Sequence, residues 1–226
     1  MRNFSPDILV EVTRACDRRC RGCYAPNLLI GSEVLWNVEK PGLFLNRESL
    51  QIALNTLTAG YKVDTIGIRG GEPSLHPELP TLIKMASNFA KKVFIETHGR
   101  WLNLVKPGSL SEHILTECRE SGAVLKISFD SMHGISGDRL KHLLDTAEEY
   151  RVEWVIAITE ETKAEALNIS ETAPWLSREN VIFQHKAKTS SGLVRPRLGT
   201  VTTEGKIQRQ LTSKFENPKI PTEVLA

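Results

Sequence analysis

The sequence predicts an α/β fold in which six strand–helix units build a partial (β/α)6 TIM barrel. Two observations support this prediction. Short apolar runs, long enough for buried strands, alternate with segments whose apolar residues recur at helical spacing, a pattern typical of repeated βα units with a parallel sheet. The residues best suited to chemistry directly follow several of these runs. In barrels of this kind the active site lies at the carboxyl ends of the strands.

The first half of the chain supplies the first two units. The apolar run 8–12 is the first predicted strand. Asn46 is suited to cap a helix that has apolar residues at every third or fourth position and that stops at Gly60. The second predicted strand is 63–68, and the helix after it is expected to begin at Pro77.

The middle of the chain continues the alternation. The third predicted strand is 92–96, and Ser109-Leu110-Ser111-Glu112 forms a capping box for the next helix. Cys118 lies on the apolar stripe of that helix, so we interpret it as a buried core residue. The fourth predicted strand is 123–129, and a helix with Leu140 on its inward face follows.

The last predicted strands are 153–158 and 181–183, with a helix over 161–176 between them. We therefore predict a barrel domain over residues 1–187. Residues 188–226 are predicted to be an extension of turns and a short hairpin, with a tail that we expect to be mobile. Residues 25–45 are interpreted as an insertion that covers the site or is an ordinary surface loop.

Cys16, Cys20 and Cys23 follow the first predicted strand at C-x3-C-x2-C spacing. Three sulfurs so close on one loop can converge on a common metal centre, and neighbouring basic residues favour the thiolate form. Disulfides or reactive thiols are weaker alternatives, because three thiols leave one unpaired. Structural zinc and ferredoxin clusters normally use four ligands, and a local fourth ligand is missing here.

A second motif follows the second predicted strand. Gly70 and Gly71 would allow backbone to approach a ligand closely, and Glu72 would then offer a carboxylate acceptor before Pro73. Alone, a Gly-Gly sequence is usually only a turn. Together, the cysteine spacing and this motif resemble the radical S-adenosylmethionine (radical SAM) superfamily, in its compact form without an auxiliary-cluster (SPASM) extension.

This resemblance implies a 4Fe-4S cluster on Cys16, Cys20 and Cys23, whose fourth iron binds S-adenosylmethionine. It also implies cofactor-binding roles for residues at the strand ends and around the third cysteine. These residues are Gly22, Tyr24, Gly70, Gly71, Glu72, Pro73, Thr97, Ser128, Asp130 and Arg139.

The sequence departs from the family pattern in three places. Gly22 stands where an aromatic residue usually precedes the third cysteine, and the aromatic Tyr24 follows that cysteine instead. Asp17 and His98 each stand where the family commonly has asparagine. None of these changes removes an iron ligand. Four further histidines, His113, His133, His142 and His185, share no spacing and are interpreted as surface or core residues. Among these four, His185 is the one best placed to face the cavity, because it follows the sixth predicted strand.

The activity implied by the resemblance is that of an oxidoreductase. The reduced cluster splits S-adenosylmethionine into methionine and a 5′-deoxyadenosyl radical, which abstracts hydrogen from a peptide or small-metabolite substrate. A flavodoxin- or ferredoxin-type protein would donate the electron. Three alternatives stay open: a glycyl-radical-enzyme activating enzyme, an enzyme like 7-carboxy-7-deazaguanine synthase, or a non-catalytic iron–sulfur or zinc protein.

The composition indicates which broad class of protein this is and which kinds of partner it does not favour. The chain has 226 residues, 40% of them hydrophobic and 25% charged, which is ordinary for a globular domain. Its 29 basic and 27 acidic residues give a net charge of +2, too balanced to indicate nucleic-acid binding. No run is long enough to span a membrane, and the N-terminus lacks the apolar core of a signal peptide. We therefore expect a cytoplasmic protein without a membrane partner.

Overall fold

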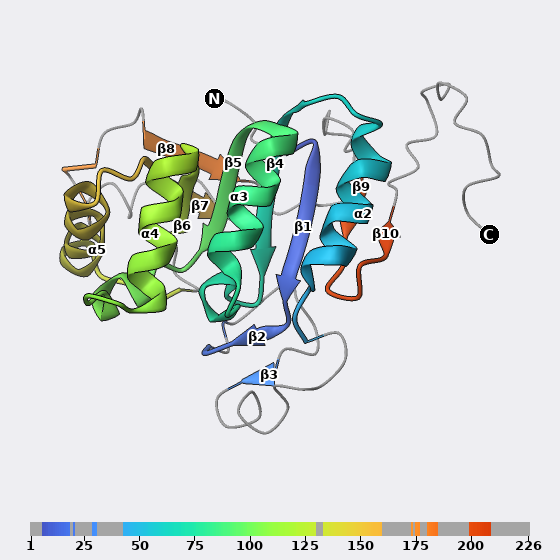
Figure 1. Ribbon diagram of the computed structural model, residues 1–226. Coiled ribbons are helices and arrows are strands. Elements are labelled where there is room, and N and C mark those ends of the chain that lie inside the picture. Colours follow the sequence, from blue (N-terminus) through green and yellow to red (C-terminus); the bar gives the residue numbers. More distant parts are fainter. Residues whose placement is uncertain are drawn as a thin grey trace.

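The computed structural model describes residues 6–18, 20, 29–30, 43–129, 133–159, 173, 175–176, 180–184 and 199–208 (Figure 1). Its strands are β1 (Ile8–Thr13), β2 (Ala15–Cys16), β3 (Leu29–Ile30), β4 (Val63–Gly70), β5 (Ala90–Thr97), β6 (Val124–Ser128), β7 (Trp154–Thr159), β8 (Val181–Gln184), β9 (Gly199–Val201) and β10 (Ile207–Gln208). Its helices are α2 (Arg47–Thr58), α3 (Leu79–Phe89), α4 (Leu110–Ser121) and α5 (Gly137–Glu149), with short 3-10 helices η1 (Pro73–Leu75) and η2 (Arg100–Leu104).

The main sheet has the order β10-β9-β1-β4-β5-β6-β7-β8. Every neighbouring pair from β9 to β8 is parallel, and only β10 at the edge is antiparallel. The sheet is open, because β8 and β10 lie at opposite ends of this order. The predicted α/β partial barrel is therefore confirmed, and all six predicted strands are present within a few residues of their expected bounds.

The C-terminal part of the described chain adds to the sheet. β9 pairs with β1, and β10 folds back on β9 through a turn in which Gly205 N–H donates to the Thr202 carbonyl. Nothing in the sequence predicted that β9 would lie beside the first strand of the barrel. The proposed boundary between residues 187 and 188 stays a prediction, and the tail lies outside the described residues.

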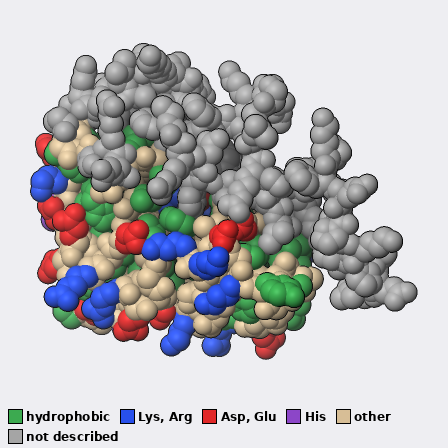
Figure 2. All heavy atoms as spheres, turned by 90° about the horizontal axis from the view of Figure 1, so that it is seen from above, with side chains coloured by type: hydrophobic (Ala, Val, Ile, Leu, Met, Phe, Trp, Pro, Cys, Tyr) green, Lys and Arg blue, Asp and Glu red, His purple; other side chains and the backbone are tan. Residues whose placement is uncertain are grey.

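Helices α2 to α5 all cover the same face of the sheet (Figure 1). The residues of β1, β4, β5 and β6 that point toward them are apolar and almost fully buried, and with the inward faces of the helices they form one core. Seen from above, Lys and Arg side chains are interspersed with Asp and Glu side chains over the described surface (Figure 2). None of the helices in the described part of the chain has the length and apolar character needed to cross a membrane.

Side-chain caps explain where three of these helices begin. Asn46 accepts a hydrogen bond from Ser49 N–H (2.8 Å), and Ser109 and Ser136 cap α4 and α5 in the same way. The Glu112 carboxylate of the predicted capping box accepts from Gly108 N–H (2.7 Å). The prediction that α3 begins at Pro77 is wrong. Its N-cap is Glu78, and the proline in its first turn comes two residues later.

Two predicted segments cannot be compared with the structure. The helix predicted over 161–176 and the insertion predicted over 25–45 lie mostly outside the described residues.

On the sheet face that points away from the helices, side chains form successive layers along the strands. Gly67 lies there beneath Pro6, and a Cβ on Gly67 would approach the proline ring to 2.9 Å. Two residues further along, the next layer is charged, with an Arg69–Glu11 ion pair (2.8 Å) and a Lys126–Glu96 ion pair (2.8 Å). The strands reach their carboxyl ends about two residues beyond this charged layer. The candidate motifs lie at that edge, which is at the bottom of Figure 1.

Candidate functional site

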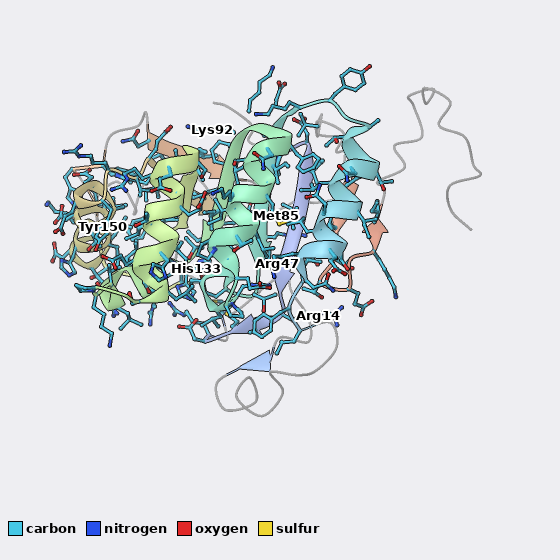
Figure 3. All side chains as sticks on the ribbon, in the orientation of Figure 1. Arg14, Arg47, Met85, Lys92, His133 and Tyr150 are labelled. Atoms are coloured by element: carbon cyan, nitrogen blue, oxygen red, sulfur yellow. The ribbon has the colours of Figure 1, made fainter. Side chains whose placement is uncertain are left out.

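The cysteine segment begins directly after β1. Thr13 Oγ1 accepts a hydrogen bond from Ala15 N–H (2.9 Å), and Cys16 ends the short strand β2, which pairs with β3. Cys16 is buried and Cys20 is partly buried, and neither is part of a disulfide in the described part of the chain. Gly22, Cys23 and Tyr24 lie outside the described residues. Arg14 and His133, labelled in Figure 3, lie toward the same edge of the sheet.

The Gly-Gly-Glu segment is hydrogen-bonded to the strand that carries Cys16. Gly71 N–H donates to the Thr13 carbonyl and Glu72 N–H to the Ala15 carbonyl, both at 2.8 Å. A Cβ on Gly70 would lie 2.5 Å from the Thr13 carbonyl oxygen, and one on Gly71 would lie 2.2 Å from that of Ala15. The glycines are therefore required by the close approach of the chain's own backbone. Their predicted approach to a ligand stays a prediction.

Glu72 lies at the centre of a hydrogen-bond network and is only 1% exposed. Its Oε1 accepts from Ser74 N–H (3.1 Å) and from the Thr97 hydroxyl (2.7 Å). Its Oε2 accepts from His98 N–H (3.1 Å) and lies 3.2 Å from His98 Nε2. A carboxylate has about four acceptor positions, and three of them accept hydrogen bonds from within the chain. The carboxylate predicted at the barrel mouth is thus largely occupied by the chain's own donors in this structure.

Thr97 ends β5 and links three groups. While its hydroxyl donates to Glu72, its oxygen accepts from Gly99 N–H and from Trp101 Nε1–H, both at 3.0 Å. Gly99 has a left-handed backbone (φ +73°), which lets the chain turn directly into η2. Thr97 therefore holds the end of β5 against Glu72, and Pro73 continues the network as the buried first residue of η1.

His98 and Asp17 contact each other, which we did not predict. His98 Nε2 lies 2.7 Å from Asp17 Oδ1. Burial alone would lower the pKa of His98, but the Glu72 and Asp17 carboxylates outweigh it and raise the pKa above its usual value. The hydrogen bond from His98 lowers the pKa of Asp17. The indication of this contact in the sequence was that Asp17 and His98 each stand where the family commonly has asparagine.

Of the remaining predicted residues, Ser128 and Arg139 are described. Ser128 ends β6 and is partly buried, whereas Asp130 lies outside the described residues. Arg139 is in the exposed first turn of α5. Arg18 Nη2 would lie 3.9 Å from a Cβ on Gly134, just before α5. Two candidate positions therefore lie at the end of β6 and in the first turn of α5.

Arginines gather between the cysteine segment and α5. Burial, together with repulsion from Arg18 and Arg139, lowers the pKa of Arg100. Arg18 Nη1 and Arg100 Nε are buried without a hydrogen-bond partner in the described part of the chain. Guanidinium groups in this arrangement are suited to bind an anionic group such as a carboxylate.

A model of the radical SAM superfamily matches residues 10–172, which is most of the chain and includes both motifs. The chain belongs to the radical SAM superfamily. The predicted family is therefore confirmed, and with it the cofactors of that family, S-adenosylmethionine (AdoMet) and a 4Fe-4S cluster.

Three comparisons describe what this radical SAM chain resembles. The S-adenosylmethionine-dependent nucleotide dehydratase of Lacinutrix mariniflava is 27% identical over 127 residues, which cover 56% of this chain and 24% of the relative. Streptococcus suis SuiB bound to its precursor peptide SuiA shares 15% identity with a TM-score of 0.56, over 92% of this chain and 43% of SuiB. The enzyme anSMEcpe with bound AdoMet and a peptide shares 15% identity with a TM-score of 0.53, over 79% of this chain and 50% of that one.

The chain spans a quarter of the curated relative and half or less of these two solved structures. At such low identity, the two structures show a shared radical SAM fold. What each of these proteins acts on is a property of that protein.

The described cysteines fit the radical SAM cluster. Cys16 and Cys20 lie close enough to interact electrostatically, and soft thiolates are the ligands that iron–sulfur clusters use. Among the described residues no group of three His, Cys, Asp or Glu forms a metal site, and Cys23, the third expected ligand, lies outside them.

The ionisation of Cys16 differs from our expectation. We predicted that neighbouring basic residues favour the thiolate form. Instead, burial raises the pKa of the Cys16 thiol to about 12, and the negative charges of Glu72 and Asp17 act in the same direction. Without a metal Cys16 therefore stays a neutral thiol at ordinary pH. Iron must displace its proton on binding.

We predict that Cys16 reacts slowly in the chain without its cluster. At pH 8, iodoacetamide should modify Cys20 at least about tenfold faster than Cys16, because only the thiolate reacts. Cys118 is also buried, and burial raises its pKa, so it should react as slowly as Cys16. Mass spectrometry of tryptic peptides after timed anaerobic labelling measures these rates. Equal rates at Cys16 and Cys20 would contradict the environment described for Cys16.

Proposed function

We propose that this chain is a radical SAM enzyme that abstracts hydrogen from a peptide or a small metabolite. The observation that supports this most directly is the pairing of the Gly-Gly-Glu segment with the backbone that carries Cys16. This pairing joins the cluster-binding motif to the motif proposed to bind AdoMet. When reduced, the bound cluster supplies an electron that splits AdoMet into methionine and a 5′-deoxyadenosyl radical.

The chain's own residues would bind and orient these cofactors. Cys16, Cys20 and Cys23 are proposed to hold the cluster. Gly70 to Pro73 and Thr97 would form the wall around the methionine amino group, with Gly22 and Tyr24 next to the adenine. Ser128, Asp130 and Arg139 are proposed for the methionine carboxylate end, and Arg18 and Arg100 add positive charge on that side. Reduced thiols and a flavodoxin- or ferredoxin-type electron donor are consistent with a cytoplasmic location.

A polar substrate is favoured by the charged layer on the sheet face that points away from the helices. The layer is formed by one charged side chain from each of the neighbouring strands β1, β4, β5 and β6, close to the carboxyl ends of these strands. These side chains are Glu11, Arg69, Glu96 and Lys126. The Lys126 side chain is only 2% exposed. Apolar branched residues normally fill such a layer in barrels. Buried ion pairs add little stability over apolar residues. The partly exposed members of the layer, Glu11, Arg69 and Glu96, are therefore proposed to contact a polar ligand.

We predict that this charged layer is not needed for folding. Lys126→Met alone should lower the free energy of unfolding by about 3 kcal/mol, because it leaves the Glu96 carboxylate without its partner. Lys126→Met combined with Glu96→Leu should cost less than about 1 kcal/mol. Urea denaturation of the chain without its cluster measures both values. A double variant as unstable as the single one would show that the layer has a structural role.

The proposed activity is tested by anaerobic reconstitution with iron and sulfide, followed by dithionite and AdoMet. We expect 5′-deoxyadenosine, measured by liquid chromatography and mass spectrometry, from the wild type. Cys118→Ala, which removes a buried thiol of α4 away from the site, is the matched control and should retain the activity. Cys20→Ala should lose it. Equal cleavage by Cys20→Ala and the wild type, or tetrahedral zinc in anaerobically purified protein, would reject the proposal.

Deuterated candidate substrates would then identify the substrate class. Label from a peptide should appear in 5′-deoxyadenosine if the chain acts as the peptide-bound structures suggest. Label from a nucleotide would favour an activity like that of the curated relative.

A further inference from the structure

The His98 imidazole joins three segments that are far apart in the sequence. It lies after β5 and is nearly buried, with 6% of its side chain exposed. Its Nε2 faces Asp17 Oδ1 in the cysteine segment at 2.7 Å and Glu72 Oε2 in the Gly-Gly-Glu segment at 3.2 Å. One ring nitrogen therefore contacts a carboxylate from each of the two cofactor motifs.

The other ring nitrogen fixes the direction of this contact. His98 Nδ1 accepts a hydrogen bond from Arg100 N–H (3.1 Å). In the neutral ring the proton must then be on Nε2, where it points at Asp17 and Glu72. The ring cannot turn over without losing the bond from Arg100 and the bond to Asp17 together. The backbone of η2 thus holds the imidazole as an oriented donor.

Asp17 immediately follows Cys16, so its position restrains the backbone of the cysteine segment. That segment is attached on one side through the Ala15 carbonyl, which accepts from Glu72 N–H (2.8 Å). The Asp17–His98 hydrogen bond attaches it on the other side to the end of β5. Residues on both sides of Cys16 are therefore tied to the rigid sheet. Such support by surrounding hydrogen bonds orients metal ligands.

We propose that His98 is a positioning residue that acts through Asp17: it holds Cys16 against the Gly-Gly-Glu segment before either cofactor binds. Because these hydrogen bonds already hold the cluster motif beside the AdoMet motif, the two motifs do not have to become ordered when the cofactors bind. The inference rests on the proposed function, because it assigns Cys16 to the cluster and Glu72 to the AdoMet side.

The first test uses the chain without cofactors. His98→Ala should raise the alkylation rate of Cys16 at pH 8 by about tenfold, the effect of losing one hydrogen bond to a charged group. Asp17→Ala should raise it at least as much, because it also removes a negative charge that raises the pKa of Cys16. Adding His98→Ala to Asp17→Ala should have no further effect, because both changes break the same link. His98→Gln keeps a side-chain donor and should restore most of the protection. His76→Gln is the matched control, because His76 is equally buried but bonds to Leu45 and Glu78 instead.

Rates that multiply in the double variant would show that His98 and Asp17 act independently, and this would overturn the proposal. So would a His98→Ala rate equal to that of the wild type. If His98→Ala does not fold, His98→Leu takes its place, since it fills much of the same volume but has no donor. It should speed alkylation of Cys16, whereas His98→Gln should not, and equal rates in His98→Leu and the wild type would overturn the proposal.

The second test uses the reconstituted protein and electron paramagnetic resonance of the dithionite-reduced cluster. The wild-type signal should change when AdoMet is added. His98→Ala should retain its iron, since the cysteines remain, but should need about tenfold more AdoMet for the same change. A wild type without any AdoMet-dependent change would reject the proposed function. A His98→Ala response identical to the wild type would reject only the positioning role.

Discussion

Gly71→Ala is expected to lower the free energy of unfolding by more than about 3 kcal/mol and to abolish stable iron binding. The added methyl group would lie 2.2 Å from the Ala15 carbonyl oxygen and 3.0 Å from the Cys16 Cβ. Both contacts involve backbone or its immediate neighbour, so a side-chain rotation cannot relieve them. The two motifs would have to separate. Urea denaturation and iron analysis after anaerobic reconstitution measure the two effects.

Gly108→Ala is the matched control for this prediction. Gly108 has a left-handed backbone (φ +75°), but a Cβ there meets nothing within 4 Å. Its substitution should therefore cost about 1–2 kcal/mol from backbone strain alone and leave iron binding intact. Equal losses for the two variants would show that the close approach of the two segments does not matter.

Glu72→Ala is expected to abolish AdoMet cleavage and to lower the free energy of unfolding by about 3–5 kcal/mol. The change leaves Ser74 N–H, the Thr97 hydroxyl and His98 N–H without their shared acceptor. Buried donors without partners are costly. Glu72→Gln should fold better than Glu72→Ala. It should still cleave poorly, because its amide brings a donor where the network needs an acceptor.

Glu78→Ala tests whether loss of any nearby carboxylate has this effect. Glu78 pairs with Arg47 at 3.0 Å, but both side chains are largely exposed. The cost should therefore stay below about 1 kcal/mol, with AdoMet cleavage unchanged. Thermal or urea unfolding and 5′-deoxyadenosine formation report both quantities. Full cleavage activity in Glu72→Ala would remove Glu72 from the proposed site.

The fold was largely predictable because its signals are local. Each buried parallel strand is a short apolar run, and each helix has a 3.6-residue period with a capping residue such as Asn46 or Ser109. The error at the start of α3 has the same origin. Pro77 and Pro80 are both compatible with a first turn, and only packing selects Glu78 as the N-cap.

The sequence alone therefore determined the order of the strands and helices, the cysteine spacing and the position of Gly-Gly-Glu after β4. Only the tertiary structure decided that Gly70 and Gly71 admit the backbone at the end of β1 and in β2, that β9 lies beside β1, and that His98 bonds to Asp17. These contacts join residues up to about 190 positions apart, as for Ile8 and Gly199. Periodicity reports which face of an element is buried, but it carries no information on which distant element will cover that face.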